Sequence, residues 1–277
     1  MKKITKILIV SLIFILSIGL SSCSIKKDAI LTIALSNIRK MKNYDLVMDM
    51  NYGLSVLGLS VNTSTTSSGT VYSDPMKMKI ETKVNILGQE QNIQIYAEQI
   101  GDNIVTYTGI NNGSWQKSET PLNNVSSVSQ YNMKDSASLY LENLNNFTQT
   151  GIEKINDRDA YKIEGTINGS TLEKLFASNN YLQGASSLGV NNSTISEMFK
   201  NMDDMPIAIW IDKGSLYPVK FNLDLSSVLG SMMNNLGNNL TISNYLGLID
   251  INKFSMIITL SNINKASNFD IPSEAKK

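Results

Sequence analysis

A two-residue alternation of apolar and polar side chains is the feature that most constrains the fold of this chain. Between Met76 and Ile86, apolar residues alternate with lysine, glutamate and asparagine, which is the pattern of a strand with one wet face. Similar alternation recurs over 205–211, 219–225 and 254–260. It therefore predicts an antiparallel sheet, one face of which has to be covered by apolar groups.

The order of the remaining elements supports a single domain. Helical spacing of apolar residues predicts a first helix over 28–41, and a strand with bulges at Gly53 and Gly58 follows it. A Thr- and Ser-rich segment then leads to a turn at 71–75, and short strands to Trp115 complete a meander. Further helices are expected from Asp135 through Phe147, near Ser170 and near Thr194. The fold class we predict is α+β, with one long antiparallel sheet covered on one face by helices.

The N-terminus has the layout of an export signal. Lys2, Lys3 and Lys6 precede the apolar run Ile7 to Leu20, which is shorter than the ~20 residues that a membrane-spanning helix needs. The run ends in Leu20-Ser21-Ser22-Cys23. Residues 1–22 are therefore expected to be a removable signal peptide.

The segment Leu20-Ser21-Ser22-Cys23 resembles the bacterial lipobox. Its small residues fit an extended chain into a peptidase cleft, and the Cys23 thiol is the nucleophile that would accept a diacylglyceryl group. Insertion of an acyl chain into a membrane contributes about 0.8 kcal/mol of binding free energy per buried methylene. We expect lipid attachment at Cys23, a tether over 23–30, a folded domain over 31–277, and residence on the extracytoplasmic face of the cell membrane. The alternatives are an ordinary secretory signal with a chance cysteine, or an uncut signal anchor.

Composition narrows the possible chemistry. The chain has no histidine and Cys23 is its one cysteine, so the usual zinc ligands and the Ser-His and Cys-His couples are missing. Asp203-Asp204 is the nearest paired-acid motif, but adjacent acids just before Pro206 are more typical of a solvated loop. We therefore expect no enzyme activity, no metal and no cofactor, with an enzyme based on aspartate and lysine as the remaining alternative.

Charge argues against a nucleic-acid partner. Removing the three signal lysines from 24 basic residues leaves 21 against 24 acidic residues, a net charge of −3. Arg39 and Arg158 are the only arginines, so neither a basic stripe nor a set of base-reading guanidinium groups is available.

Three local stretches resemble the LolA-like superfamily of lipoprotein carriers and the related lipid-binding lipoproteins of actinobacteria. They are 151–163 (GIEKINDRDAYKI), 209–220 (IWIDKGSLYPVK) and 269–272 (FDIP), which look like the strand after the middle helix, a hairpin, and the terminal strand of that group. Met76 to Lys79 and Trp115-x-Lys117 also resemble a lipoprotein family of low-GC Gram-positive bacteria.

The resemblance implies an unclosed half-barrel whose helices cover an apolar concave face. It would hold acyl chains between the sheet and the helices, and the alternation selects the residues that would line this cavity: Met78, Ile80, Val84, Ile95, Ile207, Ile209, Val219, Phe221, Leu223 and Ile258. The alternative for each of them is simple packing against the helices. The expected function is binding of a lipid, a lipidated molecule or another amphiphile; the alternative is a structural or regulatory envelope lipoprotein that contacts another envelope protein and binds no ligand.

The lipid-attachment hypothesis leads to a direct test. Replacing Cys23 by Ala removes the thiol that would accept the diacylglyceryl group, so the variant is expected to be released to the medium or to remain uncut. Metabolic labelling with a radioactive fatty acid measures the result. Acyl labelling of Cys23→Ala at the level of the unchanged protein would disprove the assignment.

Overall fold

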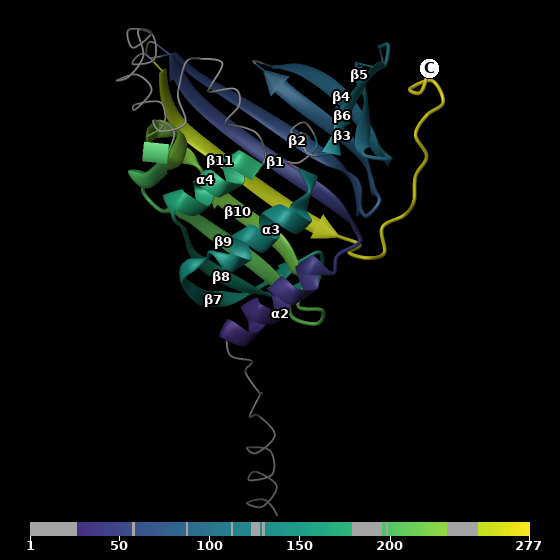
Figure 1. The fold of residues 1–277 in the computed structure, drawn as a ribbon. Coiled ribbons are helices and arrows are strands. Elements are labelled where there is room, and N and C mark those ends of the chain that lie inside the picture. The colour runs from purple at the N-terminus through teal and green to yellow at the C-terminus, as the bar shows by residue number, and fades with distance from the viewer. Residues whose placement is uncertain are drawn as a thin grey trace, which may run out of the picture.

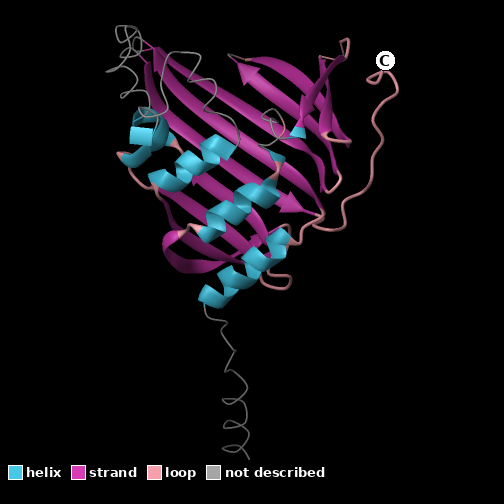
Figure 2. Ribbon diagram, in the orientation of Figure 1, coloured by secondary structure: helices cyan, strands magenta, loops and turns pink. Residues whose placement is uncertain are grey.

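The structure is a computed structural model, and it describes residues 27–56, 59–86, 88–111, 113–122, 128, 131–178, 196–197, 199–231 and 249–277. Its centre is one eleven-stranded antiparallel sheet that curves without closing, with the helices on its concave face (Figures 1 and 2). The predicted fold class is therefore confirmed. The strands are β1 (Asn43–Val56), β2 (Leu59–Ser73), β3 (Met76–Ile86), β4 (Gln89–Ile100), β5 (Asn103–Ile110), β6 (Gln116–Pro121), β7 (Asn145–Ile155), β8 (Arg158–Ile167), β9 (Met205–Asp212), β10 (Pro218–Asp224) and β11 (Ile249–Ser261).

The sheet consists of two meanders that meet in its middle. Its order is β6-β5-β4-β3-β2-β1-β11-β10-β9-β8-β7, so the first and the last strands of the chain are neighbours. β1 pairs with β11 from Asp45 opposite Ser261 to Val56 opposite Ile249. The register shifts between Gly53 and Leu54, but the extra residue is Asn252 of β11, while β1 pairs regularly with β2 through Gly53; the bulge lies in the partner strand and not at Gly53 as expected. Gly58, the other expected bulge, lies outside the described residues.

The helices α2 (Lys27–Arg39), α3 (Met133–Glu142) and α4 (Gly169–Ser178) cover part of the concave face. α2 turns its apolar stripe inward, and its buried residues are Ile30, Leu31, Ala34 and Ile38. These side chains join one apolar core with residues of the sheet and of α3. Because Ile30 is fully buried, the folded domain starts inside the segment 23–30 that the sequence assigned to the tether.

Several expected boundaries differ from the structure. The helix expected from Asp135 through Phe147 ends at Glu142, and Phe147 lies in β7 instead. Asn132, not Asp135, is the N-cap of α3. The terminal strand expected at 269–272 is irregular chain, and the Thr- and Ser-rich segment is the long strand β2.

The start of α4 also differs from its expected position. The helix begins at Gly169, because the Thr171 backbone N–H donates to Asn168 Oδ1 at 3.0 Å and Asn168 acts as the cap in place of Ser170. The helix expected near Thr194 begins outside the described residues.

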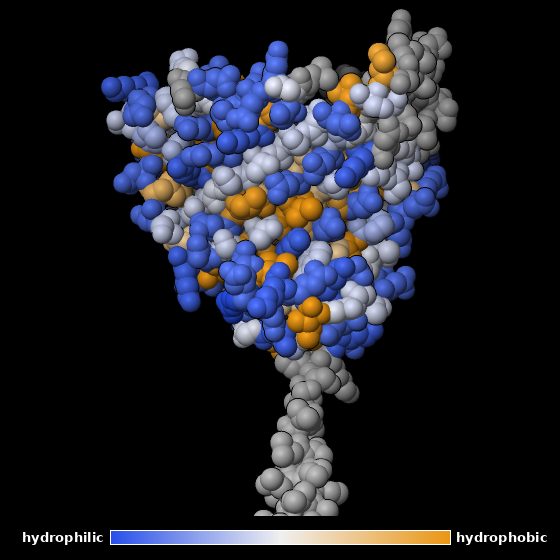
Figure 3. Space-filling view, turned by 180° about the vertical axis from the view of Figure 1, so that it is seen from behind, coloured by the Kyte–Doolittle hydropathy of each residue, from blue (hydrophilic) through white to orange (hydrophobic). Residues whose placement is uncertain are grey.

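The outer face of the sheet is polar over most of its area, as Figure 3 shows from behind. Hydroxyl groups of β2 donate to carboxylates of β1: Thr66 Oγ1 to Asp49 Oδ1 at 2.7 Å, and Thr70 Oγ1 to Asp45 Oδ1 at 2.5 Å. The C-terminal segment covers a smaller apolar cluster on β4 and β5, formed by Tyr96, Val105, Tyr107, Ile271 and Ala275. This outer cluster is separate from the core under the helices.

Close packing in β2 gives a test of the sheet. A Cβ atom added at Gly69 would collide with the Lys79 carbonyl oxygen and lie 2.9 Å from Ile80 Cα. We expect Gly69→Ala to lower the free energy of unfolding by roughly 1–3 kcal/mol, the cost of overpacking. Gly151→Ala in β7 is the matched control, since an added Cβ there meets nothing within 4 Å. Urea unfolding followed by circular dichroism measures both; equal stabilities would contradict the packing described for β2.

Candidate functional site

Most residues of the expected lining are buried in the main core. Seven of the ten residues expected to line a cavity are at most 3% exposed and belong to the main core: Met78, Ile80, Ile207, Ile209, Phe221, Leu223 and Ile258. Tyr140 of α3 lies against Phe221, with ring centroids 6.0 Å apart. In this region the sheet residues pack on the helices, as the alternative interpretation of the sequence states.

Beyond this core, the apolar lining continues along the concave face as half-buried side chains. Ile95 packs against the core, as do Met50 of β1 and Phe254 and Met256 of β11. Tyr52 meets the Phe254 ring edge-on, with centroids 4.6 Å apart. Of these five residues only Ile95 belongs to the lining expected from the sequence, although Met50 and Tyr52 follow the same two-residue spacing as the buried Met48 of β1.

Val84 and Val219 depart from the remainder of the expected lining. Val84 is half-buried, and its partners in register are Thr65 and Gln91 rather than other apolar residues. Val219 packs on the other face, against the cluster of Ala160, Ala208 and Trp210. The register of β9 and β10 shifts between Pro218 and Lys220, and such a bulge reverses the alternation on one side of it. Val219 is therefore removed from the expected lining.

Hydroxyl groups interrupt the apolar lining at β2 and β3. Ser67 is fully buried and Thr82 is 7% exposed, and their side-chain oxygens lie 2.8 Å apart in a hydrogen bond. Thr65, two residues along β2, is 9% exposed. The Ser67 and Thr82 hydroxyls satisfy each other, so this pair forms a polar spot on the inner face without an uncompensated buried group.

The phenol of Tyr44 fixes the start of α3 above the sheet. Tyr44 is fully buried in β1, and its hydroxyl donates to the Tyr131 carbonyl at 2.6 Å and accepts from the Met133 N–H at 2.8 Å. Burial raises the pKa of Tyr44 above its ordinary value, so the phenol stays protonated and can donate at physiological pH. One side chain of the sheet thereby holds the segment that leads into a covering helix.

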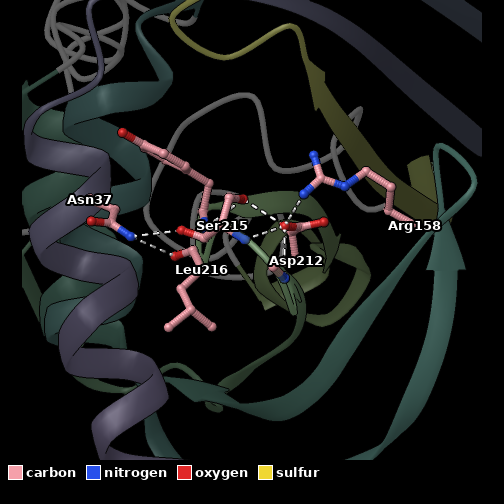
Figure 4. Close-up of polar contacts among 7 residues, drawn as sticks. Asn37, Arg158, Asp212, Ser215 and Leu216 are labelled. Carbon is pink, nitrogen blue, oxygen red and sulfur yellow. Dashed lines mark hydrogen bonds and ion pairs between the residues drawn. The ribbon is translucent and has the colours of Figure 1, made fainter.

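A second polar connection holds α2 at the end of the sheet, and it centres on Asp212 (Figure 4). Its carboxylate is 4% exposed, and Oδ1 accepts from Arg158 Nη2 at 2.7 Å and from the Ser215 N–H at 2.6 Å. The Ser215 hydroxyl and the Gly214 N–H donate to the same oxygen at 2.7 and 3.1 Å. These bonds fix the β9–β10 turn and tie it to Arg158 at the start of β8.

The same turn reaches α2 through Asn37. The Asn37 side-chain amide donates to the carbonyls of Ser215 at 3.0 Å and Leu216 at 3.3 Å. Leu216 has a φ of 55°, a left-handed conformation that is uncommon for a residue other than Gly or Asn. In this turn the carbonyls of Ser215 and Leu216 both face Asn37 of α2.

The described residues contain no group of three His, Cys, Asp or Glu side chains that could hold a metal ion. Among them, too, no helix is long and apolar enough to cross a membrane. Asp203 and Asp204 are exposed in the loop before β9, and Asp204 Oδ2 accepts from the Thr166 hydroxyl at 3.0 Å. Cys23 lies outside the described residues, so its expected lipid attachment stays a prediction.

Comparison with known proteins gives a family and a fold. The model of a family of unknown function (DUF6612) matches residues 26–277. LprF from Mycobacterium bovis aligns with 14% identity and a TM-score of 0.50, over 88% of this chain and 95% of its own, which supports the fold alone. The Mycobacterium tuberculosis lipoprotein LppX aligns with 18% identity and a TM-score of 0.48, over 88% of this chain and 100% of its own. None of the curated proteins matches the chain.

The role of Tyr44 can be measured. Tyr44→Phe removes the donor to Tyr131 and the acceptor of the Met133 N–H, so we expect the free energy of unfolding to fall by about 1–3 kcal/mol. Tyr161→Phe is the control, because the Tyr161 hydroxyl has no hydrogen-bond partner among the described residues. Hydrogen exchange should also show faster exchange at the start of α3 in Tyr44→Phe only. Unchanged exchange there would show that Tyr44 does not hold the helix.

Proposed function

Because this chain belongs to DUF6612, a family of unknown function, we propose its role from its own residues: it is a membrane-anchored lipoprotein that binds the acyl chain of a lipid or another amphiphile on the concave face. The observation that carries the proposal is the half-buried apolar lining beside the closed core, formed by Met50, Ile95, Phe254 and Met256. An apolar ligand that covers these partly exposed apolar side chains removes them from water, which lowers the free energy and favours binding.

The chemistry of this lining suits an acyl chain. Met50 and Met256 face each other across the β1–β11 pair, and their unbranched thioethers adapt to ligands of irregular shape. Thr65 lies opposite Met50 on β2, with the Ser67 and Thr82 hydroxyls farther along. A flexible apolar wall with a few polar groups beside it is typical of sites that bind amphiphiles.

The anchor belongs to the same proposal. Lipid on Cys23 would leave three residues between the modified cysteine and Lys27, where α2 begins. An extended chain spans at most ~3.6 Å per residue, so α2 would lie close to the membrane surface. The concave face would then work next to a source of acyl chains, without enzyme chemistry.

The tight core beneath the helices favours a second candidate function. Ile80, Ile209 and Phe221 are fully buried by protein alone, so that part of the concave face needs no ligand. A structural or regulatory lipoprotein that contacts another envelope protein would require only this packing. The two functions differ in what occupies the half-buried lining.

Native mass spectrometry distinguishes these functions. The chain from residue 24 onward contains every described helix and strand, and after expression in bacteria we expect it to carry a co-purified lipid. Met256→Lys places a charge on the half-buried lining, which should abolish the lipid adduct. Ile257→Lys is the matched control, because this neighbour of Met256 is also half-buried but lies opposite Asp49 on the outer face.

A lipid-free wild-type protein would contradict the binding proposal. Recovery of a stoichiometric envelope protein by that lipid-free chain would support the structural role instead. If both lysine variants kept the adduct, the ligand would bind somewhere other than the half-buried lining.

A further inference from the structure

A separate pocket lies at the end of the sheet where the β7–β8 turn, the β9–β10 turn and the end of β11 come together. Its volume is about 490 Å³, within the range of roughly 300–1,000 Å³ typical of small-molecule sites. It shares none of its lining residues with the half-buried lining of the concave face. An inference about this pocket is therefore independent of the proposed acyl-chain site.

The charged groups of the pocket leave room for an anion. Arg158, Lys265 and Asp212 are its charged lining residues. Asp212 is already neutralised by Arg158 and accepts three further hydrogen bonds on the same oxygen. Arg158 nevertheless keeps 62% of its side chain exposed, and one nitrogen of its guanidinium group makes the bond to Asp212.

The remaining donors have no competing partner in the part of the chain that the structure describes. The other guanidinium nitrogens of Arg158 and the exposed ammonium of Lys265 form no hydrogen bond or ion pair there. The Tyr217 hydroxyl accepts from Asn264 Nδ2 at 3.0 Å, and its own proton stays available to a ligand. Two cations and a phenol thus line one pocket with free donors.

The pocket also has an apolar part and fixed walls. Ile155, Val219 and Ile263 contribute apolar side chains to it. Asn156 Nδ2 donates to the Leu260 carbonyl at 3.2 Å, which ties the β7–β8 turn to β11. Walls that are held in place before binding reduce the ordering that a ligand must impose on this end of the sheet.

From these groups, we propose that the pocket binds the phosphate group of a phosphorylated amphiphile. A guanidinium fork and an ammonium are the side chains best suited to phosphate oxygens, and the net positive charge of the lining complements a monoanionic phosphodiester. The apolar side chains then contact the glycerol or the first methylenes attached to the phosphate. Because β9, β10 and α2 are joined through Asn37 (Figure 4), the site is also connected to a helix that covers the concave face.

Calorimetric titration of the chain from residue 24 onward tests this proposal. The probes are dihexanoyl phosphatidylglycerol, inorganic phosphate, and hexyl glucoside as an amphiphile without phosphate. We expect the lipid to bind most tightly and phosphate to bind weakly. The glucoside has no phosphate, so we expect it to show no binding heat that depends on the residues of this pocket.

Variants then locate the binding. Lys265→Gln should weaken lipid binding roughly tenfold, as expected for the loss of one charge-assisted hydrogen bond. Lys83→Gln in β3 is the matched control, because it removes one charge from an exposed lysine outside the pocket. Arg158→Lys keeps the charge beside Asp212 but loses the fork, and it should also weaken binding; circular dichroism establishes that each variant is folded.

Two results would overturn the proposal. Equal affinity of Lys265→Gln, Arg158→Lys and the wild type for the lipid would exclude this pocket as the binding site. Equal affinity of the wild type for inorganic phosphate and for the lipid would show that the apolar part contributes nothing, and would assign the pocket to free phosphate.

Discussion

Removal of one apolar sheet face from water is the constraint on which the rest of this structure depends. An open antiparallel sheet offers its concave side to solvent, and burial of apolar surface stabilises by about 25 cal/mol per Å². α2, α3 and α4 supply the cover, and polar bonds fix the positions of α2 and α3. Tyr44 holds the entry to α3, while Asn37 joins α2 to the β9–β10 turn. Apolar burial gives the stability, and these bonds determine where the helices lie.

The sequence predicted the elements in which apolar residues alternate clearly. β3, β9 and β10 follow the period of two, and α2 follows the period of a helix. β2 was missed because its hydroxyl side chains point to both faces, so no alternation marks it, although threonine favours strands. Its place is determined by pairing with β1 and β3 on its two sides, and such long-range partners leave no local signal.

The candidate site was predicted in part. The core residues Ile80, Ile209 and Phe221 lie on the concave face as expected, but the sequence cannot separate those under the helices from those beside them. That distinction depends on which part of the sheet α3 and α4 cover in the folded protein. Val219 was expected on the concave face but lies on the outer one, because a bulge reverses the alternation of side chains between the two faces. The pocket beside Arg158 combines three turns distant in the chain, and no spacing rule relates them.

The pairing of β1 with β11 has a consequence for how the chain is made. The first strand acquires its second neighbour only when residues 249–261 are available, roughly two hundred positions later. Until then each meander has an open inner edge, a surface on which strands of other molecules can pair. Contacts so distant in sequence are associated with slow folding. The final part of the polypeptide therefore completes the centre of the sheet, and loss of a short C-terminal piece that included β11 would divide the domain into two halves.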